Sequence, residues 1–453
     1  MSSSLMKSVS GIRGIVGDSL TPELVNQTAN ALAAHIKRGK VVVGRDSRPT
    51  GEAISMNLAS TLMMNGCQVF DIGIVPTPTV QLMVEHLGAD AGVVVSASHN
   101  PIEWNAFKLI NSTGSFFNQG EINSFFKKME KKYPASRWDR FGTFTSRDDA
   151  DDVHIDRVLS VIDVKSIKKK KFTVALDSVN GAGSVITMKL LEKLGCKVVP
   201  VHCQVTGTFP RGAEPLPENL GDLSLAVKKH GADIGFAQDP DADRLAIVDE
   251  TGRPAGEEYT VTLVTDHILE KKKGAVVVNL STTRAVEDVA AMYDVPFYRS
   301  KVGEINVVEL MRKKNALIGG EGNGGVISPE VHLGRDSLAG IGYILHMMAA
   351  RKKPVSQLLA DMPRYQMKKG KVKVSGTYDK KFYDGLKSQF RGNRISTLDG
   401  IRIDFTKDGP LKGGWVHLRA SNTEPVFRII TEGRDSEQAN AIYRHFEKIM
   451  ATS

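Results

Sequence analysis

The sequence contains few cysteines and few aromatic residues, and it has no long hydrophobic run. Among its 453 residues only Cys67, Cys196 and Cys203 are cysteines, so one stays unpaired in any scheme and neither a disulfide framework nor a cysteine zinc site is expected. No apolar stretch approaches the roughly 20 residues that span a bilayer, and the N-terminal residues lack the apolar core of a signal peptide. We therefore expect a soluble, cytoplasmic protein without a membrane partner.

A large excess of one charge sign is also missing. The 60 Lys and Arg residues against 51 Asp and Glu residues give a net charge of +9. The Lys clusters at 127–132, 168–171 and 271–273 contain no aromatic residues, and no nucleic-acid-binding motif is present. A nucleic-acid partner is therefore disfavoured against the alternative of solvated helix ends and a site for an anionic small molecule.

The arrangement of apolar runs is typical of an α/β fold. Short runs of Val, Ile and Ala alternate with helical periods, as buried parallel strands do. A pattern of strand, helix, strand and polar loop occurs three times, and its last step covers residues 87–101, 230–244 and 314–325. Because ligands of open α/β sheets bind at the carboxyl ends of strands, we expect the three loops to face one site.

Length and repeats together predict four domains. Three α/β domains are expected at 1–150, 151–252 and 253–365, followed by a smaller α+β domain at 366–453. The last domain is predicted from antiparallel strand patterns and an amphipathic helix at 434–450. Segments 137–152 and 363–371 are the expected linkers.

The second polar loop, DPDADR, indicates a metal site. It places Asp239, Asp241 and Asp243 at alternate positions, so that on an extended segment their carboxylates project to one side. Three carboxylates with open positions suit one Mg²⁺ ion acting on a phosphate. An exposed acidic turn is the alternative, and an EF-hand is disfavoured because Arg244 occupies the position that requires glycine and a strand pattern follows.

The first polar loop, SASHNP, offers Ser98 beside His99 and Asn100 at a strand end. A hydrolase triad is disfavoured, since adjacent residues rarely present a serine and an imidazole to each other and no G-x-S-x-G elbow is present. A serine directed at a Mg²⁺ site is more simply a phosphoryl carrier. A serine that only caps the turn is the alternative.

The third polar loop, GGEGNGG, matches G-x-G-x-x-G, but Pro329 and the lack of a clear helix start disfavour a dinucleotide site. Its Glu321 and Asn323 suit the recognition of hydroxyl groups, with a plain surface turn as the alternative.

A fourth cluster of polar residues lies near the C-terminus. Residues 419–429 concentrate guanidinium and hydroxyl donors that suit a phosphate dianion, with a salt-bridged surface turn as the alternative. The donors are Arg419, Ser421, Asn422, Thr423 and Arg428.

The ordered motifs, beginning with GIRG at 11–14, resemble those of the α-D-phosphohexomutases over essentially the whole chain. The resemblance implies a heart-shaped fold of four domains, three repeated α/β units and a C-terminal α+β domain, around a central cleft. It also implies that Ser98 is a phosphoserine and that its oxygen binds one Mg²⁺ together with Asp239, Asp241 and Asp243.

The resemblance assigns further residues around the substrate. Arg13, Lys108 and Arg244 would surround the transferring phosphoryl group, with Lys108 as candidate general base and His99 next to the phosphate. The substrate-binding residues that it implies are Lys301, Gly303, Glu321, Asn323, Arg419, Ser421, Asn422, Thr423 and Arg428.

The activity implied is a phosphohexomutase that works through a hexose 1,6-bisphosphate, as a monomer or homodimer. Our first expectation is the interconversion of glucosamine 6-phosphate and glucosamine 1-phosphate. A phosphomannomutase/phosphoglucomutase of broader range is the alternative, and a metal-dependent serine phosphatase is a remote one.

The sequence departs from the pattern of many members at a few positions. Asn323 and Gly325 stand where serine and histidine are common in the sugar loop, and Ser337 stands where glycine is frequent. Ser96 replaces a common threonine, which makes it a weak competitor of Ser98 for the phosphoryl group.

Overall fold

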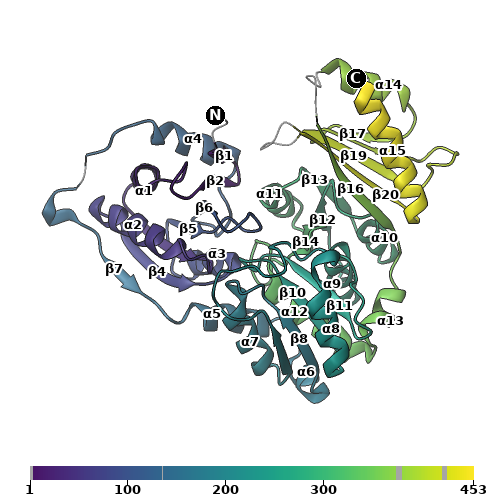
Figure 1. Cartoon of the computed structure of the whole chain (residues 1–453), viewed down its shortest axis with the longest axis horizontal. Coiled ribbons are helices and arrows are strands. Elements are labelled where there is room, and N and C mark those ends of the chain that lie inside the picture. The colour runs from purple at the N-terminus through teal and green to yellow at the C-terminus, as the bar shows by residue number, and fades with distance from the viewer. Residues whose placement is uncertain (1–3, 135, 374–379, 421–425, 453) are drawn as a thin grey trace.

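The computed structural model describes residues 4–134, 136–373, 380–420 and 426–452. Figure 1 shows four units that follow one another along the chain, each built on its own sheet, with the first and the fourth at opposite ends of the molecule. None of the helices in these ranges is long and apolar enough to cross a bilayer.

The first unit is built on a seven-stranded sheet in the order β1-β2-β6-β5-β3-β4-β7. The buried residues Val41, Val42 and Val43 of β3 fit its position inside the sheet, where it pairs in parallel with β4 and β5. Strands β6, β2 and β1 continue the sheet antiparallel beyond β5. The elements are β1 (Met6–Ser8), β2 (Gly11–Ile15), α1 (Pro22–His35), β3 (Lys40–Arg45), α2 (Gly51–Met64), β4 (Gln68–Ile74), α3 (Thr77–His86), β5 (Ala91–Val95), β6 (Trp104–Asn111), α4 (Gln119–Met129) and β7 (Phe144–Ser146).

The second and third units repeat the core of the first. Their strand orders, β11-β10-β8-β9 and β15-β14-β12-β13, match the order β6-β5-β3-β4 of the first sheet, and the first strand of each order is antiparallel to the rest. The prediction of three repeated α/β units is confirmed. The second unit contains α5 (Ala150–Leu159), α6 (Val164–Lys170), β8 (Thr173–Asp177), α7 (Gly183–Lys193), β9 (Lys197–Val201), α8 (Gly221–His230), β10 (Ile234–Gln238) and β11 (Leu245–Asp249). The third contains α9 (Glu258–Lys271), β12 (Val276–Asn279), α10 (Ala285–Met292), β13 (Phe297–Ser300), α11 (Glu304–Lys314), β14 (Ile318–Glu321), β15 (Gly325–Ile327), α12 (Ser337–Arg351) and α13 (Val355–Ala360).

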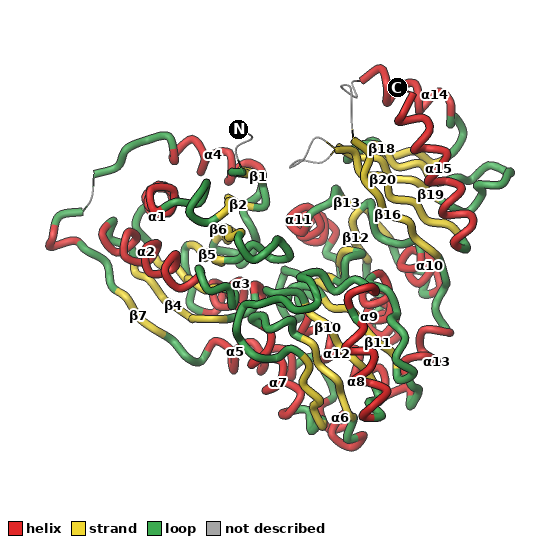
Figure 2. Tube along the Cα trace, in the orientation of Figure 1, coloured by secondary structure: helices red, strands yellow, loops and turns green. Residues whose placement is uncertain are grey.

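The fourth unit is a five-stranded antiparallel sheet in the order β16-β20-β19-β18-β17. Figure 2 shows helices α14 and α15 beside this sheet, and the apolar residues Leu418, Ile429 and Phe446 are buried between sheet and helix. The fourth unit therefore has the predicted α+β fold. The elements are β16 (Gln366–Lys373), α14 (Lys380–Gln389), β17 (Arg394–Ser396), β18 (Ile401–Asp404), β19 (Trp415–Ala420), β20 (Val426–Gly433) and α15 (Ser436–Thr452).

The two expected linkers contain regular structure. Strand β7, within 137–152, pairs in parallel with β4, and most of 363–371 belongs to β16, which pairs with β20. Their polar composition reflects edge positions and exposed faces rather than a lack of backbone pairing. The domain limits 1–150, 151–252, 253–365 and 366–453 stay a prediction, and each sheet falls within one of these ranges.

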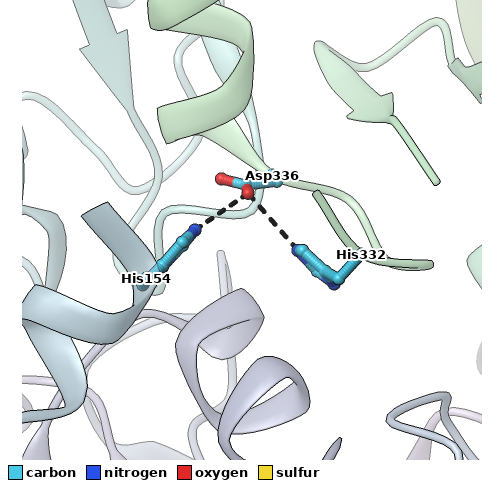
Figure 3. Close-up of side chains that lie close together, drawn as sticks. All are labelled: His154, His332 and Asp336. Atoms are coloured by element: carbon cyan, nitrogen blue, oxygen red, sulfur yellow. Dashed lines mark hydrogen bonds and ion pairs between the residues drawn. The ribbon is translucent and has the colours of Figure 1, made fainter. Parts of the chain in front are cut away.

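A buried cluster of polar side chains ties the first three units together (Figure 3). The carboxylate of Asp336, which precedes α12, lies 2.9 Å from His154 Nε2 of α5 and 3.3 Å from His332 Nε2. The other nitrogen of His154 lies 2.8 Å from the hydroxyl of Thr79 in α3. Burial raises the pKa of Asp336, but the two histidines outweigh it and lower that pKa below its usual range.

Removing the charge at the centre of this cluster should destabilise the protein. Asp336→Asn keeps an oxygen that can accept from Leu338 N and Ala339 N at the start of α12, so the substitution mainly tests the histidine contacts. We expect a loss of about 2–3 kcal/mol in chemical denaturation.

The matched control is Asp361→Asn, which removes an ion pair with Lys353 in which both side chains are largely exposed. That change should cost less than about 1 kcal/mol. Equal losses for the two variants would contradict the role assigned to Asp336.

Candidate active site

The loops that follow β5, β10 and β14 contact one another. The hydroxyl of Ser98 donates to Asp239 Oδ2 over 3.0 Å, which joins the first loop to the second. The backbone N–H of Leu245 donates to the carbonyl of Gly324 over 3.0 Å, which joins the second to the third. Gly324 has φ +88°, and a Cβ there would lie 2.4 Å from the Leu245 carbonyl oxygen, so the close approach requires glycine.

The Ser98 loop is held by a fully buried arginine. Ser98 has a left-handed backbone with φ +50°, and Arg48 donates to the carbonyls of Ser98 (2.8 Å) and Asn100 (2.6 Å). Arg48 is itself paired with Asp46, which also accepts the hydroxyl of Ser96 over 2.6 Å. The two serines therefore differ, because the hydroxyl of Ser96 donates to Asp46 whereas that of Ser98 donates to Asp239 of the aspartate loop.

The aspartate loop is a tight turn and not the extended segment expected from the sequence. Ala242 has φ +51° and its N–H donates to the carbonyl of Asp239 over 3.0 Å. The turn still gathers the carboxylates, because one oxygen from each of Asp239, Asp241 and Asp243 lies within 4.8 Å of the others. All three side chains are fully buried.

The carboxylates of this loop differ in their surroundings. Burial and the charges of Asp243 and Asp241 raise the pKa of Asp239 well above its usual range. Burial alone would also raise the pKa of Asp241, but the charge and the hydrogen bond of Lys108 lower it instead, and the Thr77 hydroxyl donates to the same carboxylate.

The residues present fit a hard divalent cation. Among the described residues, the buried Oδ1 atoms of Asp241 and Asp243 have no hydrogen-bond partner. Orphaned carboxylate oxygens of this kind are costly unless a cation binds them, and an all-oxygen set suits Mg²⁺. Asp239, Asp241 and Asp243 would hold the ion, with an oxygen on Ser98 as a further ligand.

Basic side chains contact the two residues that follow Ser98. Arg13, on β2, donates to the Asn100 side chain over 2.7 Å. Arg244 lies 3.1 Å from Nδ1 of His99 and donates to Glu214 over 2.8 Å. Burial and the neighbouring arginines lower the pKa of His99 well below its usual value, so the imidazole is neutral near pH 7.

Lys108, on β6, also contacts the aspartate loop. Its ammonium group donates to Asp241 and, over 3.3 Å, to the Thr77 hydroxyl. The structure therefore brings Lys108, Ser98 and the three aspartates together.

The sugar-loop candidates lie on two neighbouring segments. Glu321 is buried and accepts from the N–H of Gly303 over 2.9 Å, which joins the segment before α11 to the end of β14. Lys301 is exposed beside this contact. Asn323 is partly buried and accepts the N–H of Gly325 within its own loop over 3.2 Å.

The phosphate-loop candidates are only partly described. Arg419 on β19 and Arg428 on β20 are directly paired across the strands, so their guanidinium groups share one face of the fourth sheet. Arg419 Nε lies 3.7 Å from Asp399, whose carboxylate accepts the N–H of Val302 over 3.0 Å. Ser421, Asn422 and Thr423 lie outside the described residues.

Several residues of this site were not predicted. Asp46 and Arg48 follow β3 in the segment GRDSR, Thr77 begins α3, and Arg335 donates to both Asp243 (2.6 Å) and Glu321 (2.8 Å). The polar residues after the buried β3 were a signal for Asp46 and Arg48. Thr77 and Arg335 reach the site from distant sequence, which no local pattern indicates.

Comparisons with known proteins agree along the whole chain. Sequence models described as phosphoglucomutase/phosphomannomutase domain I, domain II, domain III and C-terminal domain match residues 5–135, 152–252, 256–365 and 358–448. A phosphoglucomutase/phosphomannomutase of Thermococcus kodakarensis is 37% identical over 95% of this chain and 94% of its own length. A probable phosphoglucosamine mutase of Methanopyrus kandleri is 35% identical over 97% and 96%.

A solved structure gives the same picture. The crystal structure of a phosphoglucomutase/phosphomannomutase family protein from Burkholderia thailandensis matches with a TM-score of 0.84 at 25% identity, over 98% of this chain and 97% of its own.

The aspartate loop yields a direct test of cation binding. Asp241→Asn removes the charge of a candidate ligand whose Oδ1 has no partner among the described residues, and it should weaken Mg²⁺ or Mn²⁺ binding by at least about 10-fold in calorimetric titration. Asp222→Asn, at an exposed position on α8, should leave the affinity unchanged. Wild-type affinity in the Asp241 variant would remove that residue from the cation site.

Proposed function

The chain belongs to the phosphoglucomutase/phosphomannomutase family and is a phosphohexomutase, and from this premise we propose that Ser98 carries the phosphoryl group exchanged with the sugar. The observation that carries the proposal is the 3.0 Å contact between the Ser98 hydroxyl and Asp239 at the edge of the carboxylate cluster. We further propose that glucosamine 6-phosphate and glucosamine 1-phosphate are the preferred substrates.

The first transfer follows from the side chains around Ser98. A bound Mg²⁺ would neutralise charge on the transferring phosphoryl group and hold it toward the sugar. Arg13 and Arg244 add positive charge, which in-line phosphoryl transfer requires as the charge spreads over the equatorial oxygens. Lys108 is the proposed base for the attacking hydroxyl: its ammonium group, which donates to Asp241, would first lose a proton to solvent, and the neutral amine would then accept the hydroxyl proton.

The product of the first transfer is a hexose 1,6-bisphosphate, which has to turn around before Ser98 takes back the other phosphoryl group. The cross-strand pair of Arg419 and Arg428 is the proposed grip for whichever phosphate is not reacting. Two like charges directly opposite each other repel, and a bound phosphate dianion would offset this repulsion in addition to the Asp399 carboxylate 3.7 Å from Arg419, which supports this role. Glu321 and the Gly303 backbone are proposed to contact the sugar hydroxyl groups.

The choice of glucosamine is supported by the Methanopyrus relative, named a probable phosphoglucosamine mutase. A phosphomannomutase/phosphoglucomutase activity is the second candidate, and the more similar Thermococcus relative with that name supports it. We propose that the enzyme is cytoplasmic, because its substrates are charged phosphosugars, and that it is monomeric or homodimeric.

The substrate proposal is tested by kcat/KM for glucosamine 1-phosphate, glucose 1-phosphate and mannose 1-phosphate, each primed with its 1,6-bisphosphate in the presence of Mg²⁺. We expect a preference of about 10-fold or more for the amino sugar, the size of one charge-assisted hydrogen bond. Equal or higher values for glucose and mannose would favour the second candidate.

The carrier proposal predicts opposite outcomes for two neighbouring serines. Ser98→Ala should lower turnover by about 10³-fold or more, because the nucleophile is lost. Mass spectrometry after incubation with a hexose 1,6-bisphosphate should find phosphate on Ser98 of the wild type. It should still find phosphate on Ser98 in Ser96→Ala, because the Ser96 hydroxyl donates to Asp46 and accepts the Ser98 N–H within its own loop. Phosphate on Ser96, or full activity of Ser98→Ala, would exclude Ser98 as the carrier.

A further inference from the structure

Arg335 is the one guanidinium of the described residues that joins the aspartate loop to the sugar loop. It lies between β15 and α12, and each of its three nitrogens donates to a different carboxylate. Nη2 contacts Asp243 (2.6 Å), Nη1 contacts Glu321 (2.8 Å) and Nε contacts Glu304 (3.0 Å). Its side chain is only 11% exposed, so these contacts are shielded from solvent.

The space that Arg335 occupies exists because residue 325 is glycine. A Cβ at Gly325 would lie 2.3 Å from Cδ and 2.8 Å from Cγ of Arg335. Any side chain at 325 would therefore displace the aliphatic part of the arginine. Gly325 and Arg335 therefore depend on each other, because the aliphatic part of the arginine packs where a side chain at 325 would lie.

Arg335 also determines how Glu321 can bind a ligand. A carboxylate accepts about four hydrogen bonds. Oε1 of Glu321 already accepts from the Asn279 side chain (2.7 Å) and the Gly303 N–H (2.9 Å), and Oε2 accepts from Arg335. One acceptor direction on Oε2 remains, and the guanidinium fixes where it points.

The contact with Asp243 leaves room for a cation on the same carboxylate. Arg335 binds Oδ2 of Asp243, whereas Oδ1 has no hydrogen-bond partner among the described residues. Asp243 can therefore bind an ion through Oδ1 and Arg335 through Oδ2 at the same time. If Asp243 shifts toward a bound ion, the carboxylate that contacts Arg335 shifts with it.

We propose that Arg335 is a positioning residue that aims the free acceptor of Glu321 at the sugar and links sugar recognition to cation binding at the aspartate loop. This inference rests on the proposed function. Glu321 distinguishes sugars only while its carboxylate is bound by Arg335. A Mg²⁺ ion at Asp243 increases the affinity for phosphosugars through the same guanidinium.

The test measures binding without turnover. Dephosphorylated protein has no phosphoryl group to transfer, so calorimetry gives the Kd of glucosamine 1-phosphate, glucose 1-phosphate and mannose 1-phosphate with and without Mg²⁺. Arg335→Met should weaken binding in Mg²⁺ by about 10-fold or more, flatten the differences among the three sugars and remove most of the effect of Mg²⁺ on the Kd.

Two further variants separate positioning from stability. Arg351→Met is the matched control, because Arg351 is a similarly shielded arginine that contacts two carboxylates, Asp266 (2.6 Å) and Glu270 (3.0 Å), away from the site. It should keep wild-type Kd values. Arg335→Lys keeps the charge but reaches fewer carboxylates, so it should fold as the wild type and still lose the sugar differences.

The outcomes distinguish this inference from the proposed function. If the wild type binds none of the three phosphosugars, the proposed function is wrong. If the wild type binds them and both Arg335 variants keep its affinities, sugar differences and Mg²⁺ effect, the positioning role is wrong. If Arg335→Met does not fold, the Arg335→Lys values decide between these results.

Discussion

Burial of three carboxylates in one loop is the constraint on which the rest of the structure depends. Asp239, Asp241 and Asp243 are fully buried, and such charges are tolerated only when they are paired. Two of the neighbouring cations come from other units, Lys108 from the first and Arg335 from the third, and Arg244 of the loop itself lies 3.9 Å from Asp239. Contacts from three units therefore stabilise the aspartate loop, and Oδ1 of Asp241 and Oδ1 of Asp243 remain without a hydrogen-bond partner among the described residues.

The fourth unit is attached differently from the other three. Its contacts to the third unit are polar and charged: Arg284 donates to the Gly413 carbonyl (2.5 Å) and lies 3.3 Å from Asp404, and the fully buried Arg402 donates to the Leu280 carbonyl. Polar interfaces between domains suit relative movement. The arginine pair proposed to bind the non-reacting phosphate belongs to this fourth unit and not to the units that supply the buried aspartate cluster.

Sequence alone predicts most of this arrangement, and its failures have physical causes. The repeated strand pattern and the strand-end rule give the three units and the grouping of Ser98 with the aspartates. The alternation of aspartates predicted their convergence but not the left-handed Ala242 that produces it. Thr77 and Arg335 were missed because their partners Asp241 and Asp243 lie far away in sequence. The sequence predicts a linker at 137–152, which contains β7, because an edge strand needs no apolar pattern.

The most direct test of the account follows one phosphoryl group. Protein labelled with ³²P on the serine is mixed with unlabelled glucosamine 6-phosphate and Mg²⁺, and the products are separated over time. If Ser98 is a carrier in a closed, multi-unit site, the label moves first to a sugar bisphosphate and then to sugar monophosphates. Release of the label as inorganic phosphate at the rate of substrate consumption would contradict the account and indicate a phosphatase.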